Sequence, residues 1–203
     1  MAIGDDYITT EELKSYMGIE SNMYDALIAN AISSASREIE KHTRRQFNLA
    51  GSATARVYQP GVAFRLPVDD FSTNAGLFIE TDDGDDGTFG TLWDVGDYEL
   101  TPYNGTMNGL PGWPFTGITA VGSKRFRWSR RANVRVTAQW GWAAVPDDVK
   151  QACFILASDT FQLKDARMGI AGSDQFGQIV RVRDNQIAAK KLRAYVRGSV
   201  LVA

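Results

Sequence analysis

The chain has 203 residues, of which 44% are hydrophobic and 23% are charged, a composition typical of a globular protein with room for one domain or for one domain carrying a large insertion. No apolar run approaches the ~18 residues that a membrane-spanning helix needs, and the acidic N-terminus lacks the basic and apolar regions of a signal peptide, so we expect a protein made in a cytoplasm with no membrane partner. The single cysteine, Cys153, excludes an internal disulfide framework.

The net charge is only −2, but the charges are segregated along the chain. Residues 66–123 contain no lysine or arginine, whereas the residues that follow are strongly basic. Either acidic and basic faces of identical subunits pack against each other, or both regions are simply solvated. The basic residues that we select as candidate partner or subunit contacts are Lys124, Arg125, Arg127, Arg130, Arg131, Lys190, Lys191, Arg193 and Arg197.

Two helices are predicted at the N-terminal end. Thr9 and Glu12 form the pattern of a capping box for a short helix over residues 9–17, and Gly18 is placed to end it in a left-handed conformation. A longer helix is predicted from about Asn22 to Gln46, because apolar residues recur there at helical spacing. These residues are Ile28, Ile32, Ala35 and Ile39.

The pattern then changes to short strands separated by turns. The segments with strand character are 55–60, 76–80, 97–102, 117–121 and 133–140, and glycine-rich and proline-rich turns lie between them. In the last segment Val134, Val136, Ala138 and Trp140 alternate with polar residues, as in a half-buried strand. We therefore expect a mostly antiparallel β module over residues 52–140.

Helices are predicted again after the β module. Pro146 begins a helix with a continuous apolar run at 152–157, which indicates a helix that is central in a core or shared between subunits. A last helix is predicted from about Asp184 to Tyr195, with Ala188, Leu192 and Tyr195 on its apolar side. The predicted fold class is α+β: a bundle of about four helices, formed by residues 1–51 and 141–203, with the β module inserted between the second and third long helices.

The residues that catalyse reactions or bind metals in other proteins are sparse. His42 has no histidine or cysteine partner at metal-ligand spacing, and Cys153 lies in an apolar run typical of a buried thiol. The acidic string that starts at Asp82 fails the EF-hand pattern at its third position, Gly84, and at its twelfth, Trp93, and is better interpreted as a hairpin turn. No nucleotide-binding or nucleophile motif is present, so we expect no enzymatic site, no cofactor and no metal.

Residues 124–131 combine basic and aromatic side chains. As a strand they would place Phe126 and Trp128 on one face and Arg125 and Arg127 on the other. Such a segment is either an ordinary hairpin with its aromatics in the core, or a surface that grips a phosphate backbone and stacks on bases.

The C-terminal tail is apolar and follows a glycine. Val200, Leu201 and Val202 favour extended structure after Gly198. The tail either adds as a strand or hydrophobic clip to a partner or a neighbouring subunit, or folds back on its own β module or is left disordered.

Three segments resemble the head-tail connector (adaptor) family of tailed bacteriophages and gene transfer agents. They are YITTEELKSYMGI at 7–19, AISSASREIEKHTRRQF at 31–47, and VRVTAQWGWAAVPDDVKQACFILASDTFQLKDA at 134–166, which is the most specific. The resemblance covers the helical parts of the chain and not the long β insertion.

The resemblance implies a structural virion protein with no chemistry of its own. In that family, subunits form a dodecameric ring in the neck of the particle, assembled in the host cytoplasm. The ring docks beneath the portal protein, receives a stopper or other tail-completion protein, and lets double-stranded DNA pass at ejection. On this basis we expect the last helix and tail to contact the portal; the alternative is a nucleic-acid-binding protein that uses its basic hairpin and C-terminal basic helix.

Overall fold

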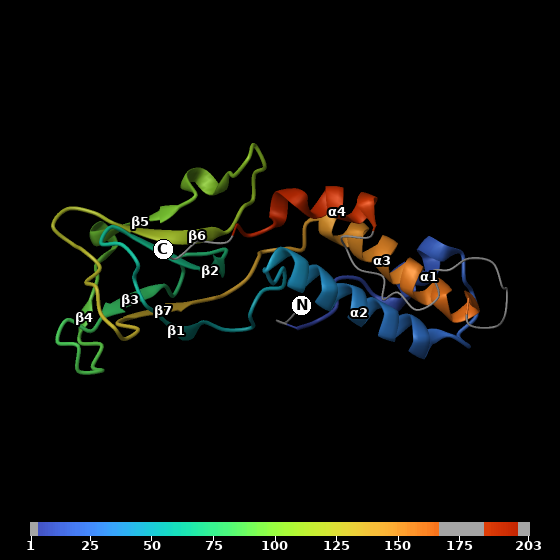
Figure 1. The fold of residues 1–203 in the computed structure, drawn as a ribbon, viewed down its shortest axis with the longest axis horizontal. Helices are drawn as coiled ribbons and strands as arrows, with labels where there is room; N and C mark the ends of the chain where they lie inside the picture. The colour runs from blue at the N-terminus through green and yellow to red at the C-terminus, as the bar shows by residue number, and fades with distance from the viewer. Residues whose placement is uncertain (1–3, 167–184, 199–203) are drawn as a thin grey trace. The chain divides into compact units, whose positions relative to one another are not determined.

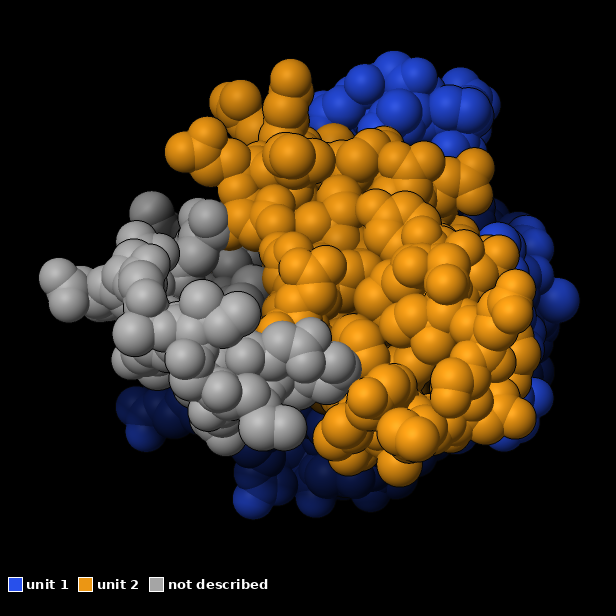
Figure 2. Space-filling view, turned by 90° about the vertical axis from the view of Figure 1, so that its right-hand side faces the viewer, with its two compact units in different colours: residues 1–3, 48–144, 200–203 blue, residues 4–47, 145–199 orange. Residues whose placement is uncertain are grey.

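A computed structural model describes residues 4–166 and 185–198. These residues contain four α-helices and two antiparallel β-sheets, which confirms the predicted α+β class (Figure 1). They form two compact units, coloured separately in Figure 2. The helical unit comprises 4–47, 145–166 and 185–198, and the β unit comprises 48–144. Within the described ranges, no helix has both the length and the apolar character needed to cross a membrane.

The first helix, α1 (Thr10–Met17), has the predicted capping box. The Thr9 hydroxyl accepts a hydrogen bond from the backbone N–H of Glu12 at 3.1 Å, and the Glu12 carboxylate accepts one from the backbone N–H of Thr9 at 2.7 Å. Gly18 ends the helix with φ 68°. Because caps of this kind contribute about 1 kcal/mol, the short helix is well defined even though Leu13 is its one buried residue.

The second helix, α2 (Asp25–Thr43), is shorter at both ends than the predicted 22–46. Its predicted apolar stripe of Ile28, Ile32, Ala35 and Ile39 is buried. Arg44 adopts a left-handed conformation and stops the helix. The chain then turns so that Phe47 packs edge-on against Tyr7 and Tyr195, with ring centroids 5.8 Å apart in each case. The aromatic contact, which is not visible in the local sequence, explains the early end.

Helix α3 (Asp147–Ala166) packs against both α2 and α4. It starts at Asp147, one residue after the predicted first residue, Pro146. Its buried residues include Val149, Ala152, Cys153, Leu156 and Ala157, whereas Phe154 and Ile155 are only partly buried. The helix therefore buries one broad side, and the apolar run includes residues that reach the surface of the unit.

Helix α4 (Gln186–Leu192) continues into a 3-10 turn, η3 (Arg193–Tyr195). It begins two residues after the predicted start because Asn185 caps it, accepting hydrogen bonds from the N–H groups of Ile187 and Ala188. The predicted apolar side, formed by Ala188, Leu192 and Tyr195, is buried as expected.

The β unit contains two sheets. The first has the order β1 (Thr54–Tyr58), β7 (Val134–Ala138), β3 (Phe78–Thr81) and β4 (Thr91–Leu92). The second has the order β2 (Arg65–Phe71), β6 (Phe115–Ala120) and β5 (Tyr98–Thr101). Each of the five predicted segments contains a strand. Sequence reasoning missed β2, which contains Pro67 and has an irregular register before Phe71, and the two-residue β4.

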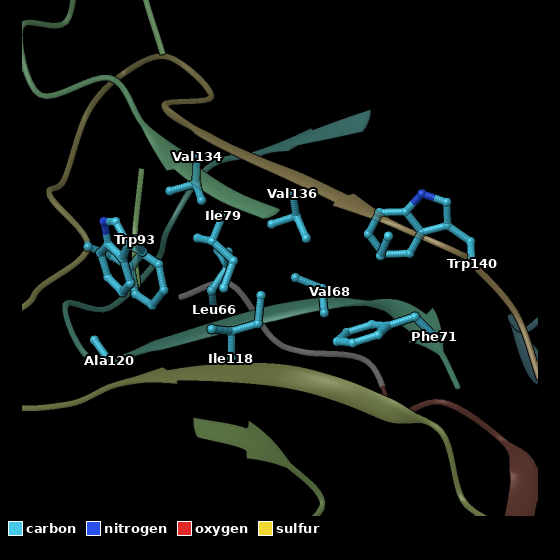
Figure 3. Packing of buried hydrophobic residues seen from close by; sticks show 12 residues of the cluster. Leu66, Val68, Phe71, Ile79, Trp93, Ile118, Ala120, Val134, Val136 and Trp140 are labelled. Atoms are coloured by element: carbon cyan, nitrogen blue, oxygen red, sulfur yellow. The ribbon is translucent and has the colours of Figure 1, made fainter. Parts of the chain in front are cut away.

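Side chains from the two sheets face each other in the core of this unit (Figure 3). Ile79, Val134 and Val136 come from the first sheet, and Leu66, Val68 and Ile118 come from the second. The alternation predicted for residues 134–140 is confirmed, since Val134, Val136, Ala138 and Trp140 are all buried.

A Trp-Gly-Trp bend follows β7. The indole N–H of Trp140 donates to the carbonyl of Thr54 at 2.8 Å, and that of Trp142 donates to the Asp70 carboxylate at 2.8 Å. Gly141 has φ 107°, and a Cβ atom at this position would lie 1.8 Å from the carbonyl oxygen of Asn48. Only glycine fits between the two tryptophans.

Candidate interface surfaces

The basic segment 124–131 is not a hairpin, and its aromatic residues do not share a face. The segment contains no strand, Phe126 is buried at 2% exposure, and Trp128 is 74% exposed. The prediction was wrong because Phe126 stacks on Trp93, with ring centroids 4.7 Å apart, and its backbone N–H donates to the carbonyl of Ala63 at 2.7 Å. The segment thus runs beside the loop that precedes β2.

The acidic loop after β3 faces this basic segment within the same chain. The side chain of Arg127 donates to the backbone carbonyl of Asp83, and the Ser129 hydroxyl donates to the Asp85 carboxylate at 2.6 Å. The backbone N–H of Thr88 and, more weakly, the charge of Arg131 lower the pKa of the Asp86 carboxyl. Much of the charge that is segregated in the sequence is therefore brought together in the folded β unit.

Three ion pairs neutralise charge in the β unit. Lys124 pairs with Asp97 at 3.0 Å, Arg56 with Asp69 at 2.6 Å, and Arg135 with Glu80 at 2.6 Å. Of the predicted contact residues, Lys124, Arg127 and Arg131 thus lie against acidic residues of their own chain. Arg125 lies over the ring of Phe64 at 4.6 Å, and Arg130 is exposed.

The second predicted basic group lies on and after α4. Lys190 and Arg193 are exposed, whereas Lys191 pairs with Asp148 at 3.4 Å. The backbone N–H of Arg197 donates to the carbonyl of Thr43 at 2.9 Å, which joins the segment after η3 to the last residue of α2. The predicted tail contacts Val200, Leu201 and Val202 and the glycine-rich segment 168–179 lie outside the described residues.

The cysteine thiol and the Asp82 carboxylate, which could carry chemistry, make structural contacts in this fold. The Sγ atom of Cys153 lies 3.6 Å from the Ser36 hydroxyl, and burial raises the pKa of the thiol to about 12, so the nucleophilic thiolate is scarce at neutral pH. The Asp82 carboxylate accepts hydrogen bonds from the N–H groups of Asp86 and Gly87. Among the residues that the structure describes, no three His, Cys, Asp or Glu side chains are grouped to hold a metal ion.

A groove on the helical unit was missed by sequence reasoning. Its volume is about 660 Å³. The described residues that line it are partly apolar and partly polar: Tyr16, Met17, Ile19, Ile155, Ser158, Asp159, Phe161 and Gln162. The sequence offered one indication of this groove. Helix α1 and the loop after it contain several apolar residues, although Leu13 is the one buried residue of the helix. The sequence does not show that these apolar residues meet the partly exposed side of α3.

The fold has known counterparts, although no family model and no curated protein matches the sequence. A chain of the neck of an empty GTA particle, computed with C6 symmetry, superposes with a TM-score of 0.53 at 16% identity, over 91% of this chain and 88% of that one. A chain of the neck of a native GTA particle, computed with C12 symmetry, gives 0.51 at 17%, over 94% of each chain.

A chain from the virion of a native gene transfer agent (GTA) particle gives a TM-score of 0.53 at 19% identity, over 100% of this chain and 96% of that one. All three matches include the β unit, for which the sequence resemblance gave no expectation. The chain therefore shares its fold, over nearly its whole length, with chains from the neck and virion of gene transfer agent particles.

Proposed function

We propose that the chain is a structural virion protein, a head-tail connector (adaptor) subunit located in the neck of a phage-like particle. The observation that carries this proposal is the end-to-end fold similarity, which covers 91–100% of this chain and 88–96% of the neck and virion chains. Fold alone does not define function, but here the resemblance of the three sequence segments points to the same place in the particle.

The proposed assembly is a dodecameric ring beneath the portal protein. The counterpart necks were computed with C6 and C12 symmetry, and a ring requires a heterologous contact that repeats from copy to copy. The opposite face of the ring would receive a stopper or other tail-completion protein. Double-stranded DNA would pass through the channel without being gripped.

The arrangement of charge favours a protein through which DNA passes, rather than a protein that binds DNA. Binding to a phosphate backbone needs cationic side chains that are free to displace counterions. In the basic segment, Arg127 and Arg131 lie against the acidic loop, and Lys124 is paired with Asp97. The negative charge of these nearby acids weakens the attraction of the segment for phosphate, which favours DNA as passing cargo.

The proposal is tested by electron microscopy of the purified protein, alone and mixed with its portal. The expected result is a twelvefold ring seated coaxially on the portal. The proposal is overturned, in favour of the nucleic-acid-binding alternative, if the protein stays monomeric, does not bind the portal, and binds duplex DNA with an affinity that falls steeply as the salt concentration rises.

A further inference from the structure

Trp128 is exposed while the other tryptophans of the chain are buried. The chain has five tryptophans. Trp93, Trp113, Trp140 and Trp142 are at most 5% exposed, whereas Trp128 is 74% exposed. Because an indole is costly to leave in water and is enriched at the energetic centres of interfaces, this side chain marks a contact surface.

The backbone on both sides of Trp128 is held in place. The carbonyl of Arg127 accepts a hydrogen bond from the Asn133 amide at 3.0 Å, and the carbonyl of Ser129 accepts one from the Gln59 amide at 2.8 Å. Just before them, Phe126 is anchored in the core. The indole therefore projects from a fixed loop, and binding through it would lose little conformational entropy.

Neighbouring side chains extend the exposed surface. The loop containing Val62 and Phe64 runs beside the Trp128 loop, joined to it through Ala63 and Phe126. Val62 and Phe64 are both more than half exposed, and the guanidinium of Arg125 covers the Phe64 ring. We call these four residues, Val62, Phe64, Arg125 and Trp128, the Trp128 patch. It is apolar and cationic, the composition found at interface centres.

The groove on the helical unit has the complementary chemistry. Tyr16, Ile19 and Ile155 supply apolar walls, and Asp159 supplies a carboxylate. At about 660 Å³ the groove lies within the range of pockets that hold small aromatic groups.

We propose that the Trp128 patch of one copy docks into this groove on a second copy, with the indole against the apolar walls and Arg125 facing Asp159. Asp159 already accepts a hydrogen bond from Asn185 at 2.7 Å, and a carboxylate has room for further donors. Patch and groove are different surfaces of the same chain, so the contact is heterologous and repeats around a ring. This inference rests on the proposed ring function and names the surfaces that close the ring.

The experiment compares Trp128→Ala with Val95→Ala, a control in the same unit at an 81% exposed apolar residue. Both variants are expected to keep the wild-type melting temperature, because neither side chain is buried. Ring assembly on portals, scored by electron microscopy against protein concentration, is expected to need at least about tenfold more protein for Trp128→Ala and to be unchanged for Val95→Ala.

Cross-linking provides a second, direct readout. A double variant with Trp128→Cys and Tyr16→Cys is treated with a short bis-maleimide on portals, at a protein concentration high enough to offset the loss of the indole, and is expected to give a ladder of covalent oligomers. The pair Val95→Cys with Tyr16→Cys serves as the control and is expected to give none. The native Cys153 is buried and stays unreacted.

The outcomes separate the two proposals. The docking contact is overturned if Trp128→Ala forms rings at the same protein concentration as the wild type. It is also overturned if the cross-linked ladder is no stronger than that of the control pair. Either result leaves the ring function standing. Failure of the wild type to form rings on portals overturns the ring function itself and removes the docking contact with it.

Discussion

Arg135 on β7 and Glu80 on β3 lie directly opposite each other, and the guanidinium of Arg135 makes two hydrogen bonds, of 2.7 and 2.6 Å, to the Glu80 carboxylate. Arg135 also lies over the Phe89 ring, 4.8 Å from its centroid. This bidentate pair ties the central strand to its neighbour and lowers the pKa of Glu80. It is one of the places where the acidic and basic stretches of the sequence meet inside the chain.

The first prediction is a pH dependence of stability at this pair. A carboxyl whose pKa is lowered on folding stabilises the protein at pH values above its unfolded pKa, and the stabilisation is lost as the pH falls through the folded value. Wild type is therefore expected to unfold at higher urea concentration than Glu80→Gln at pH 7, with the difference disappearing well below pH 4. Urea titrations at pH 7 and pH 3 measure it. A difference that persists undiminished at pH 3 would show that the pair does not act through charge.

The second prediction concerns the core of the helical unit. Leu156 on α3 is 2% exposed and Leu163 on the same helix is 41% exposed. Leu156→Ala is expected to cost ~2–5 kcal/mol through lost burial and a residual cavity, whereas Leu163→Ala is expected to cost less than about 0.5 kcal/mol. Thermal and urea melts of the isolated protein compare them. Equal losses would remove Leu156 from the core.

The third prediction concerns the bend after β7. Gly141→Ala forces a side chain into a left-handed backbone and into the carbonyl of Asn48, so we expect a loss of at least about 3 kcal/mol or failure to fold. Gly96→Ala is the control, since nothing lies within 4 Å of a Cβ atom there. Soluble yield and melting temperature distinguish the two variants, and a stable Gly141→Ala protein would contradict the close approach seen in this bend.

The fourth prediction separates charge that is paired within the chain from charge that is available to neighbours. Arg130 and Arg131 are both exposed, and the charge of Arg131 also acts on Asp86 of its own chain. Arg130→Glu is expected to leave the melting temperature unchanged and to weaken ring assembly on portals if basic and acidic surfaces of neighbouring subunits meet. Raising the salt concentration should weaken wild-type assembly in the same direction. Assembly that responds to neither change would remove intersubunit charge pairing at Arg130.

The fifth prediction concerns the tail. Deleting residues 198–203 is expected to abolish portal binding while the melting temperature is kept, because we propose that the apolar tail, with Arg193 and Arg197 before it, contacts the portal. Binding is measured by co-sedimentation with purified portal, and stability by thermal melting. Portal binding that survives the deletion refutes the clip, whatever happens to stability.

The features that the sequence predicted correctly are those encoded locally. The capping box at Thr9, the start of α3 after Pro146 and the alternation at Val134–Trp140 each depend on residues within a few positions of one another. Hydrogen bonds at a helix start and the two-residue period of a strand are local physical effects, so their patterns can be read directly.

The features that it did not predict depend on distant residues. Strand β2 carries Pro67 and two aspartates, and is held in place by pairing with β6. Phe126 turns into the core because Trp93 stacks on it and because its backbone N–H bonds to Ala63, both from other segments, whereas Trp128 stays exposed. The groove beside Tyr16 forms only where α1 and α3 meet. None of these contacts leaves a periodic signal in the sequence.

The burial of Cys153 affects how the protein responds to an oxidising medium. A subunit of the kind proposed above would be made in a reducing cytoplasm and would then meet an oxidising medium, in which accessible thiols cross-link or oxidise. The only thiol of this chain is packed inside the helical unit, and burial holds it in the protonated form. For the function proposed above, oxidation of this thiol is therefore not expected to accompany the move of the particle from a reducing to an oxidising medium.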